Sequence, residues 1–109
     1  MATPDYPIFV NSTQYQTVAA SQSNAALGPG GGGAGDYLSH LTIVPASTSP
    51  GAVSIADGGG SAITVFVGGA SSVLSLLPFK VAIGAKSTSG AWKITTGAAV
   101  SVVAMGQFT

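Results

Sequence analysis

Cysteine, arginine and glutamate are all missing from this chain of 109 residues. Without thiol groups the protein can form neither disulfide bonds nor zinc–thiolate sites. Charged residues make up only 6% of the chain, and three lysines balance three aspartates. An average soluble protein is roughly 25% charged. Because no basic cluster is available to neutralise phosphates, we expect no nucleic-acid partner.

Long apolar runs are missing as well. The longest uninterrupted ones span a few residues, whereas a membrane-spanning helix needs about 20. Residues 1–5 contain neither the basic region nor the apolar region of an export signal. We therefore expect a protein that is made in the cytoplasm and has no membrane partner.

The low charge also bears on assembly. Like-charge repulsion helps to keep soluble proteins apart, and this neutral chain, with a mean hydropathy of +0.52, has little of it. We expect a homo-oligomer in which another protein surface covers much of this one. The alternative is a monomer whose surface consists of Ser, Thr, Asn and Gln side chains.

Strand-forming residues and turn residues alternate along the chain at intervals of roughly 8–12 residues, which is typical of a β-sandwich or barrel. Val, Ile, Thr and Gly are abundant, and good helix formers are few. We predict strands over residues 37–44, 53–56, 62–67, 73–77, 79–83, 91–95 and 99–104. Residues 18–27 are also predicted as strand, although their alanines leave a short helix as the alternative.

Several of these segments alternate between apolar and polar residues with a period of two, which places one face of each strand against a core. The residues predicted to face inward are Phe79, Val81 and Ile83 in one segment, Ile63, Val65 and Val67 in another, and Trp92 and Ile94 in a third. The fold class we predict is all-β, an antiparallel β-sandwich in one domain over residues 1–109.

Two stretches resemble each other, residues 48–55 and residues 88–94. Each is followed by a glycine-containing turn and a similar strand, so the sequence predicts the same hairpin twice. Two equivalent hairpins suit a Greek-key sandwich such as the jelly roll. The alternative is chance, because Gly, Ala, Ser and Val are common throughout the chain.

Two segments in the N-terminal third, residues 1–12 and residues 28–35, differ in composition from the predicted strands. Residues 28–35 are mostly glycine and predict a loop. Residues 1–12 hold two prolines and predict an extended arm outside the main core. The apolar residues of this part need a surface to cover them, so we predict a partner interface at Tyr6, Ile8, Phe9, Val10 and Tyr15. The alternative is that residues 6–10 form the first edge strand of the sandwich.

Catalytic residue types are few. His40 could complete a Ser-His-Asp triad, but no GxSxG sequence is present. It lies in a predicted strand with Leu38, Thr42 and Val44 on its face, which favours a core or interface position.

The three aspartates, Asp5, Asp36 and Asp57, each lie beside Gly or Pro, where such side chains cap the backbone. The spacing of the glycines in residues 28–35 matches a dinucleotide fingerprint, but a strand is predicted after them where that fingerprint needs a helix. We predict no catalytic residue, no metal site and no cofactor.

The sequence also resembles small virion proteins of tailed bacteriophages, of the capsid decoration (cement) or head-fibre type. The likeness covers roughly residues 35–109 and lies in residues 35–38, 43–45, 49–55, 57–58, 62–66 and 89–93. It implies a jelly-roll-like β-sandwich, often trimeric, on the outer surface of a capsid, and it implies no catalytic residue.

This resemblance and the composition lead to one expectation of function. The protein is expected to be a non-enzymatic decoration protein that forms a homotrimer and binds the major capsid protein of the virion. The alternative is a tail or fibre module that recognises host carbohydrate, with Trp92 or the tyrosines stacking on sugar rings. The alternation with Ile94 favours a core position for Trp92.

Overall fold

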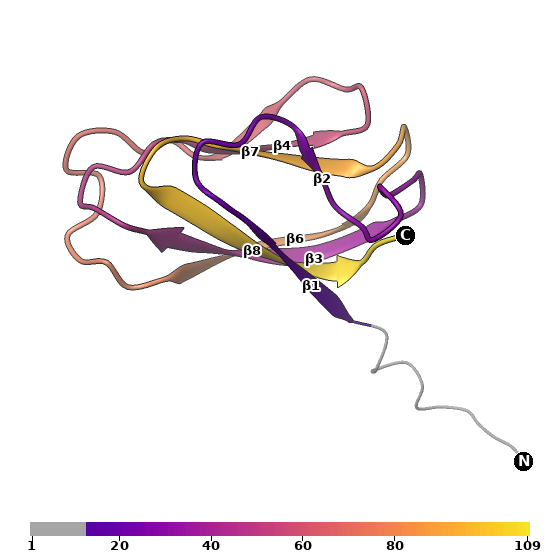
Figure 1. Cartoon of the computed structure of the whole chain (residues 1–109), viewed down its shortest axis with the longest axis horizontal. Coiled ribbons are helices and arrows are strands. Elements are labelled where there is room, and N and C mark those ends of the chain that lie inside the picture. The colour runs from indigo at the N-terminus through magenta and orange to yellow at the C-terminus, as the bar shows by residue number, and fades with distance from the viewer. Residues whose placement is uncertain (1–12) are drawn as a thin grey trace, which may run out of the picture.

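Short segments rich in β-branched and aromatic residues form the strands of this protein. The structure, a computed structural model, describes residues 13–109, which contain no helix (Figure 1). The strands are β1 (Gln14–Val18), β2 (Ala25–Ala26), β3 (Tyr37–Pro45), β4 (Val53–Asp57), β5 (Ile63–Phe66), β6 (Phe79–Lys86), β7 (Trp92–Thr96) and β8 (Val100–Gln107).

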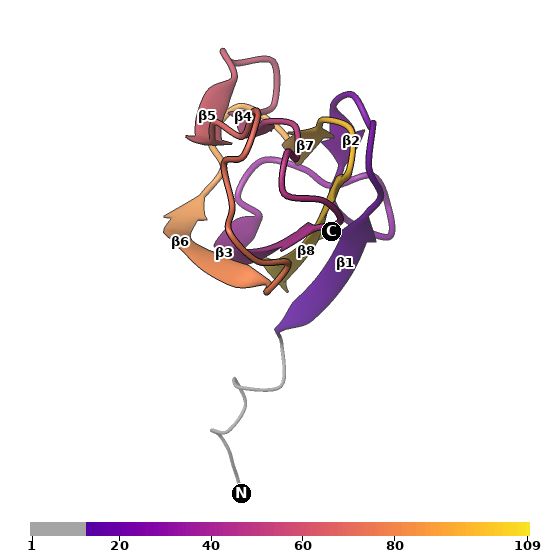
Figure 2. The same cartoon turned by 90° about the vertical axis from the view of Figure 1, so that its left-hand side faces the viewer.

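The strands make two four-stranded antiparallel sheets that face each other, with the orders β1-β8-β3-β6 and β2-β7-β4-β5 (Figure 2). The predicted β-sandwich is therefore confirmed. The pairs β1·β8, β2·β7, β3·β6 and β4·β5 are those of one long hairpin with the β4–β5 turn at its tip. Rolling that hairpin up adds the pairs β3·β8 and β4·β7.

This topology sorts the loops into two groups. The β1–β2, β3–β4, β5–β6 and β7–β8 loops lie at one end of the sandwich. The β2–β3, β4–β5 and β6–β7 loops lie at the other end, together with the first and last described residues, Thr13 and Thr109 (Figure 1).

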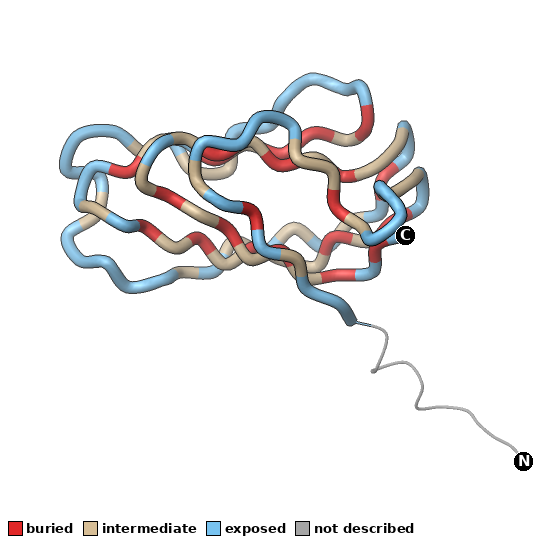
Figure 3. The backbone as a smooth tube through the Cα atoms, in the orientation of Figure 1, coloured by how far each residue is buried: buried red, intermediate tan, exposed pale blue. Residues whose placement is uncertain are grey.

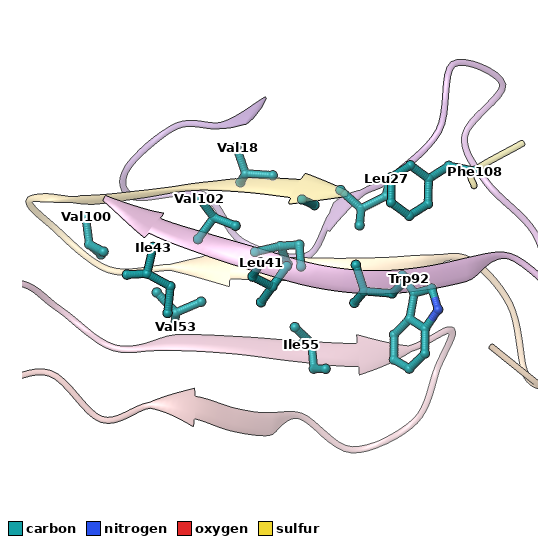
Figure 4. Packing of buried hydrophobic residues seen from close by; sticks show 13 residues of the cluster. Val18, Leu27, Leu41, Ile43, Val53, Ile55, Trp92, Val100, Val102 and Phe108 are labelled. Atoms are coloured by element: carbon teal, nitrogen blue, oxygen red, sulfur yellow. The ribbon is translucent and has the colours of Figure 1, made fainter. Parts of the chain in front are cut away.

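The core fills the space between the two sheets (Figure 4). Strands β7 and β8 alternate between buried and half-buried residues, and Trp92 and Ile94 both point inward, as predicted. Phe79, Val81 and Ile83 of β6 pack against the same core, also as predicted. Burying a Leu, Ile or Val side chain contributes about 1.5–3 kcal/mol, so this cluster is the main source of stability.

Two β-bulges shift side chains away from the faces that strict alternation predicts. In β5 the extra residue is Val65, after which Phe66 pairs with Val53 and packs on the core while Val67 is exposed. In β3 the extra residue relative to β8 is Ser39. It places Leu38 in the core, on the opposite face from His40.

The strand predicted at residues 73–77 is wrong, because this segment is part of the exposed β5–β6 loop (Figure 3). Main-chain N–H groups of the loop donate to the β3–β4 loop: Gly69 to the oxygen of Pro50 at 2.8 Å and Val73 to the oxygen of Thr48 at 3.4 Å. Residues 73–77 therefore have no strand beside them to pair with.

Two other predictions are corrected. The repeated hairpin is wrong: β4 and β5 form a hairpin within one sheet, but β7 and β8 belong to different sheets. Of residues 18–27, only Val18 and the short β2 lie in strands. A turn separates them, in which Ser21 and Asn24 have positive φ values of 60° and 50°. Residues 28–35 form the predicted loop.

Candidate partner-binding surfaces

The two described aspartates hold loops together at the end of the sandwich where the described chain begins and ends. The carboxylate of Asp36, a buried residue, accepts hydrogen bonds from the main-chain N–H of Gly33 at 2.9 Å and of Thr109 at 3.1 Å, and from the Thr109 hydroxyl at 3.0 Å. Burial raises the pKa of this carboxyl group, but these hydrogen bonds outweigh it and hold the pKa below the ordinary value.

Asp57, a half-buried residue at the end of β4, does the same for the β6–β7 loop. Its carboxylate accepts from the main-chain N–H of Ser89 at 2.9 Å and of Thr88 at 2.9 Å, and from the Thr88 hydroxyl at 2.9 Å. The main-chain bonds from Ser89 and Thr88 lower the pKa of Asp57. Asp36 caps local backbone at Gly33, as predicted, whereas the groups that Asp57 binds are about 30 residues away.

His40 is half-buried on the outer face of β3, so a core position is wrong. Its Nδ1 lies 3.1 Å from the hydroxyl of Ser39, the preceding residue. The hydrogen bonds of the Asp36 and Asp57 carboxylates go to the loop and terminal groups described above, so neither aspartate orients the imidazole.

Among the predicted interface residues, Tyr15 lies in the described part of the chain. Tyr6, Ile8, Phe9 and Val10 lie outside the described residues, as does the predicted arm, residues 1–12. Tyr15 is 72% exposed on β1, an edge strand. With its neighbours on β1 and with Pro29 and Phe108 it lines an open groove of about 450 Å³.

The glutamines beside Tyr15 are engaged within the protein. The Gln16 side chain accepts from the main-chain N–H of Gly28 at 2.7 Å and donates to the oxygen of Ala26 at 3.1 Å, which ties β1 to the edge of the other sheet. The Gln14 side chain accepts from the N–H of Phe108 at 2.6 Å. These bonds fix the part of β1 that carries Tyr15, while the Tyr15 ring itself is exposed to solvent.

Trp92 offers no such surface. It is buried in the core, and its indole N–H donates to the main-chain oxygen of Asp36 at 3.0 Å (Figure 4). The core position predicted for Trp92 is confirmed, and stacking of this ring on a sugar would require the sandwich to open.

No family model, curated protein or solved structure matches this chain. Within residues 13–109, no three side chains of the types that bind metals come close enough together to hold an ion. The same residues contain no helix that could cross a membrane.

The loops at the opposite end of the sandwich carry no charged residue. We call this surface the uncharged end and define it as residues 19–24, 46–52, 67–78 and 97–99. The charged residues at the other end are Asp36, Asp57, Lys86 and Lys93; the remaining described one, Lys80, is the second residue of β6.

Large apolar side chains are exposed at the uncharged end. Leu74 is 98% exposed, Val67 78%, Leu77 73% and Leu76 50%. All four belong to the β5–β6 loop, which crosses from one sheet to the other in the view onto this end (Figure 2). Sequence patterns alone did not reveal this surface, because the apolar residues at 73–77 predict a strand. The available signal was an uncharged stretch, residues 58–79, that holds three leucines.

Hydrogen bonds tie the four loops of the uncharged end to one another in a row. The β1–β2 and β7–β8 loops are joined by the N–H of Ser21 and the oxygen of Gly97 at 2.9 Å. The N–H of Gly51 and the oxygen of Ala98 join the β7–β8 and β3–β4 loops at 2.8 Å. The N–H of Gly69 reaches Pro50 of the β3–β4 loop, and the N–H of Ser71 donates to the hydroxyl of Ser49 at 3.0 Å. These hydrogen bonds therefore hold the loop that carries the exposed leucines in a fixed position against the neighbouring loops.

Proposed function

We propose that this chain is a structural protein of a tailed-bacteriophage virion, a decoration protein that oligomerises and binds the lattice of the major capsid protein. The observation that carries the proposal is the exposure of large apolar side chains on a surface with very few charges. Clustered exposed apolar residues mark surfaces that another molecule covers. The expected resemblance of residues 35–109 to decoration proteins is the reason for proposing this kind of assembly.

The strand order supports the finer architecture of the proposal. The eight strands pair as one rolled hairpin, and the connections other than β4–β5 cross between the sheets. Both features support a jelly-roll topology. We propose this topology for the chain, and with it the trimeric state that the resemblance implies. The protein would be made in the host cytoplasm and would act on the outer surface of the capsid.

The mechanism of such a protein is mechanical. Each contact with a capsid subunit removes apolar surface from water, at about 25 cal/mol per Å², and this gain is offset by the entropy lost on association. A contact that is weak by itself becomes effective when an oligomer makes it several times at once. No titratable group is required, which agrees with the structural use of both described aspartates.

Two measurements test the proposed function. Mass spectrometry of purified virions of the phage that encodes the chain should find the protein in many copies per particle. The purified protein should also co-sediment with capsids of that phage and saturate at a fixed ratio to the major capsid protein. Its absence from the virions, together with no binding to capsids, would refute the proposal.

The exposed ring of Tyr15 favours one second candidate, recognition of host carbohydrate. An aromatic ring in an open groove is a platform on which a sugar can stack, and the groove is large enough for a small saccharide. Glycan binding that is lost in Tyr15→Ala and kept in Leu74→Ala would establish this function. Equal glycan binding by both variants would exclude the groove.

A further inference from the structure

Charge is distributed very unevenly between the two ends of the sandwich. Four of the described charged residues lie at the end that holds Thr13 and Thr109, while the uncharged end has none in its loops. The uncharged end also holds the three exposed leucines. The surface therefore combines two properties, no charge and high apolar exposure, that are unfavourable in water when nothing covers them.

We infer that the uncharged end is the surface through which copies of this chain bind one another, with Val67, Leu74, Leu76 and Leu77 at the centre of the contact. This inference rests on the proposed function, which requires an oligomer, and it identifies the surface through which the oligomer forms.

Charge matching favours a second copy as the occupant. An ordinary protein surface is rich in charged residues, and burying a charge without a counter-charge costs free energy. The loops of the uncharged end offer no counter-charge, so the surface that covers them must itself be nearly uncharged. The same end of a second copy meets this condition and leaves Asp36, Asp57, Lys86 and Lys93 in water. Lys80, the second residue of β6, is exposed at the border of this end.

The loop geometry lowers the cost of such a contact. The β5–β6 loop is held on the β3–β4 loop by the bonds from Gly69, Ser71 and Val73, so its main chain is already ordered before a partner arrives. Gly68 allows the close approach, since a Cβ atom there would lie 2.5 Å from the main-chain oxygen of Gly51. A preorganised surface loses less entropy on binding than a flexible one.

The test compares two matched charge substitutions in the full chain. Leu74→Asp places a charge on the uncharged end, and Ala62→Asp places one at an exposed position of the β4–β5 loop, at the other end of the sandwich. Because both side chains are largely exposed, both variants should fold, with circular dichroism and melting close to those of the original protein. Sedimentation velocity over a wide range of protein concentration then gives the strength of self-association.

We expect the original protein and Ala62→Asp to form the same oligomer, and Leu74→Asp to associate more weakly by on the order of tenfold or more. A second variant, Leu77→Ser, should weaken association without adding charge. Unchanged association in both leucine variants would overturn the inference, as would dissociation by Ala62→Asp alone.

Three other results would also overturn it, and the first two would identify a different occupant. A monomeric protein that binds capsids, but no longer binds them as Leu74→Asp, would assign the uncharged end to the capsid protein. Leu74-dependent binding of a monomer to phosphatidylcholine vesicles would assign it to a lipid surface. A protein that is monomeric at every concentration and binds neither would leave the surface without a role in association. If Leu74→Asp breaks up an oligomer that is absent from virions, the inference stands and the proposed function fails.

Discussion

Replacing Asp36 by asparagine tests whether a buried carboxylate stabilises this fold through its charge. The substitution keeps the size and shape of the side chain but removes the negative charge that faces three donors, the N–H groups of Gly33 and Thr109 and the Thr109 hydroxyl. Asparagine also has only one terminal oxygen, so its amide nitrogen must face one of these donors.

The expected cost follows from these contacts. A hydrogen bond to a charged group contributes about 1.5–3 kcal/mol, against about 1 kcal/mol for a neutral one. The two main-chain donors share one carboxylate oxygen, and removing its charge weakens both of their hydrogen bonds. For the two bonds together we expect a loss of about 2 kcal/mol in the free energy of unfolding. We take the lower part of the range because Asp36 borders an open hollow of about 290 Å³, where water screens the charge. For a chain of about this length, the melting temperature should fall by about 8–16 °C.

The pH dependence identifies the charge as the cause. The pKa of Asp36 is lowered in the folded protein, so its stabilisation is present above the unfolded-state pKa of about 3.9 and is lost as the pH falls through the lower folded-state pKa. The difference in unfolding free energy between the original protein and Asp36→Asn should therefore be largest at pH 5–7 and shrink below about pH 4. Urea denaturation followed by circular dichroism at pH 7, 5 and 3 measures it.

Asp57→Asn is the matched control. The pKa of Asp57 is also lowered, so this variant loses acid sensitivity of the same sign, but its carboxylate is exposed and the loss of stability should be smaller. The double variant should show the weakest dependence on pH below pH 5. A cost for Asp36→Asn that is the same at pH 3 and pH 7 would refute the reasoning, because a protonated aspartate and an asparagine are nearly equivalent.

Three further predictions concern packing, a loop and the N-terminal segment. Leu41→Ala, at a fully buried position, should lower the unfolding free energy by about 2–5 kcal/mol, while Leu74→Ala should change it by less than about 0.5 kcal/mol; urea denaturation compares the two. Gly68→Ala should destabilise the protein, because its φ is +68° and the new Cβ would meet Gly51; Gly59→Ala, with open space around it, should not, and thermal melting decides between them. Deleting residues 1–10 should leave circular dichroism and cooperative melting intact but reduce capsid binding; unfolding or precipitation would show that residues 6–10 belong to the sandwich core.

The strands themselves were largely predictable from local patterns. Trp92 and Ile94 flank Lys93, and Phe79, Val81 and Ile83 alternate with smaller or charged residues, so each segment carries its own period of two. Such a period reflects the geometry of a single strand, which needs no knowledge of its neighbours. The exposed loop at residues 73–77 shows the limit of this reasoning, because apolar residues alone do not provide a strand to pair with.

The candidate surfaces were less predictable. Tyr15 is a predicted interface residue because its segment precedes the denser β region, but the groove around it depends on Pro29 and Phe108, which are distant in sequence. The uncharged end is built from four separate loops, each unremarkable alone. Only the antiparallel crossing of the chain between the sheets brings them to the same end.

Composition and local alternation by themselves determined that this chain is all-β, that it has very little charge and that Trp92 belongs to the core. The tertiary structure decided which strands pair, where the bulges at Ser39 and Val65 move side chains to another face, and which end of the sandwich carries the exposed leucines. The physical reason is the range of the interactions. Strand propensity and side-chain period act between near neighbours, whereas strand order and loop position depend on contacts such as β1·β8, between residues more than 80 positions apart.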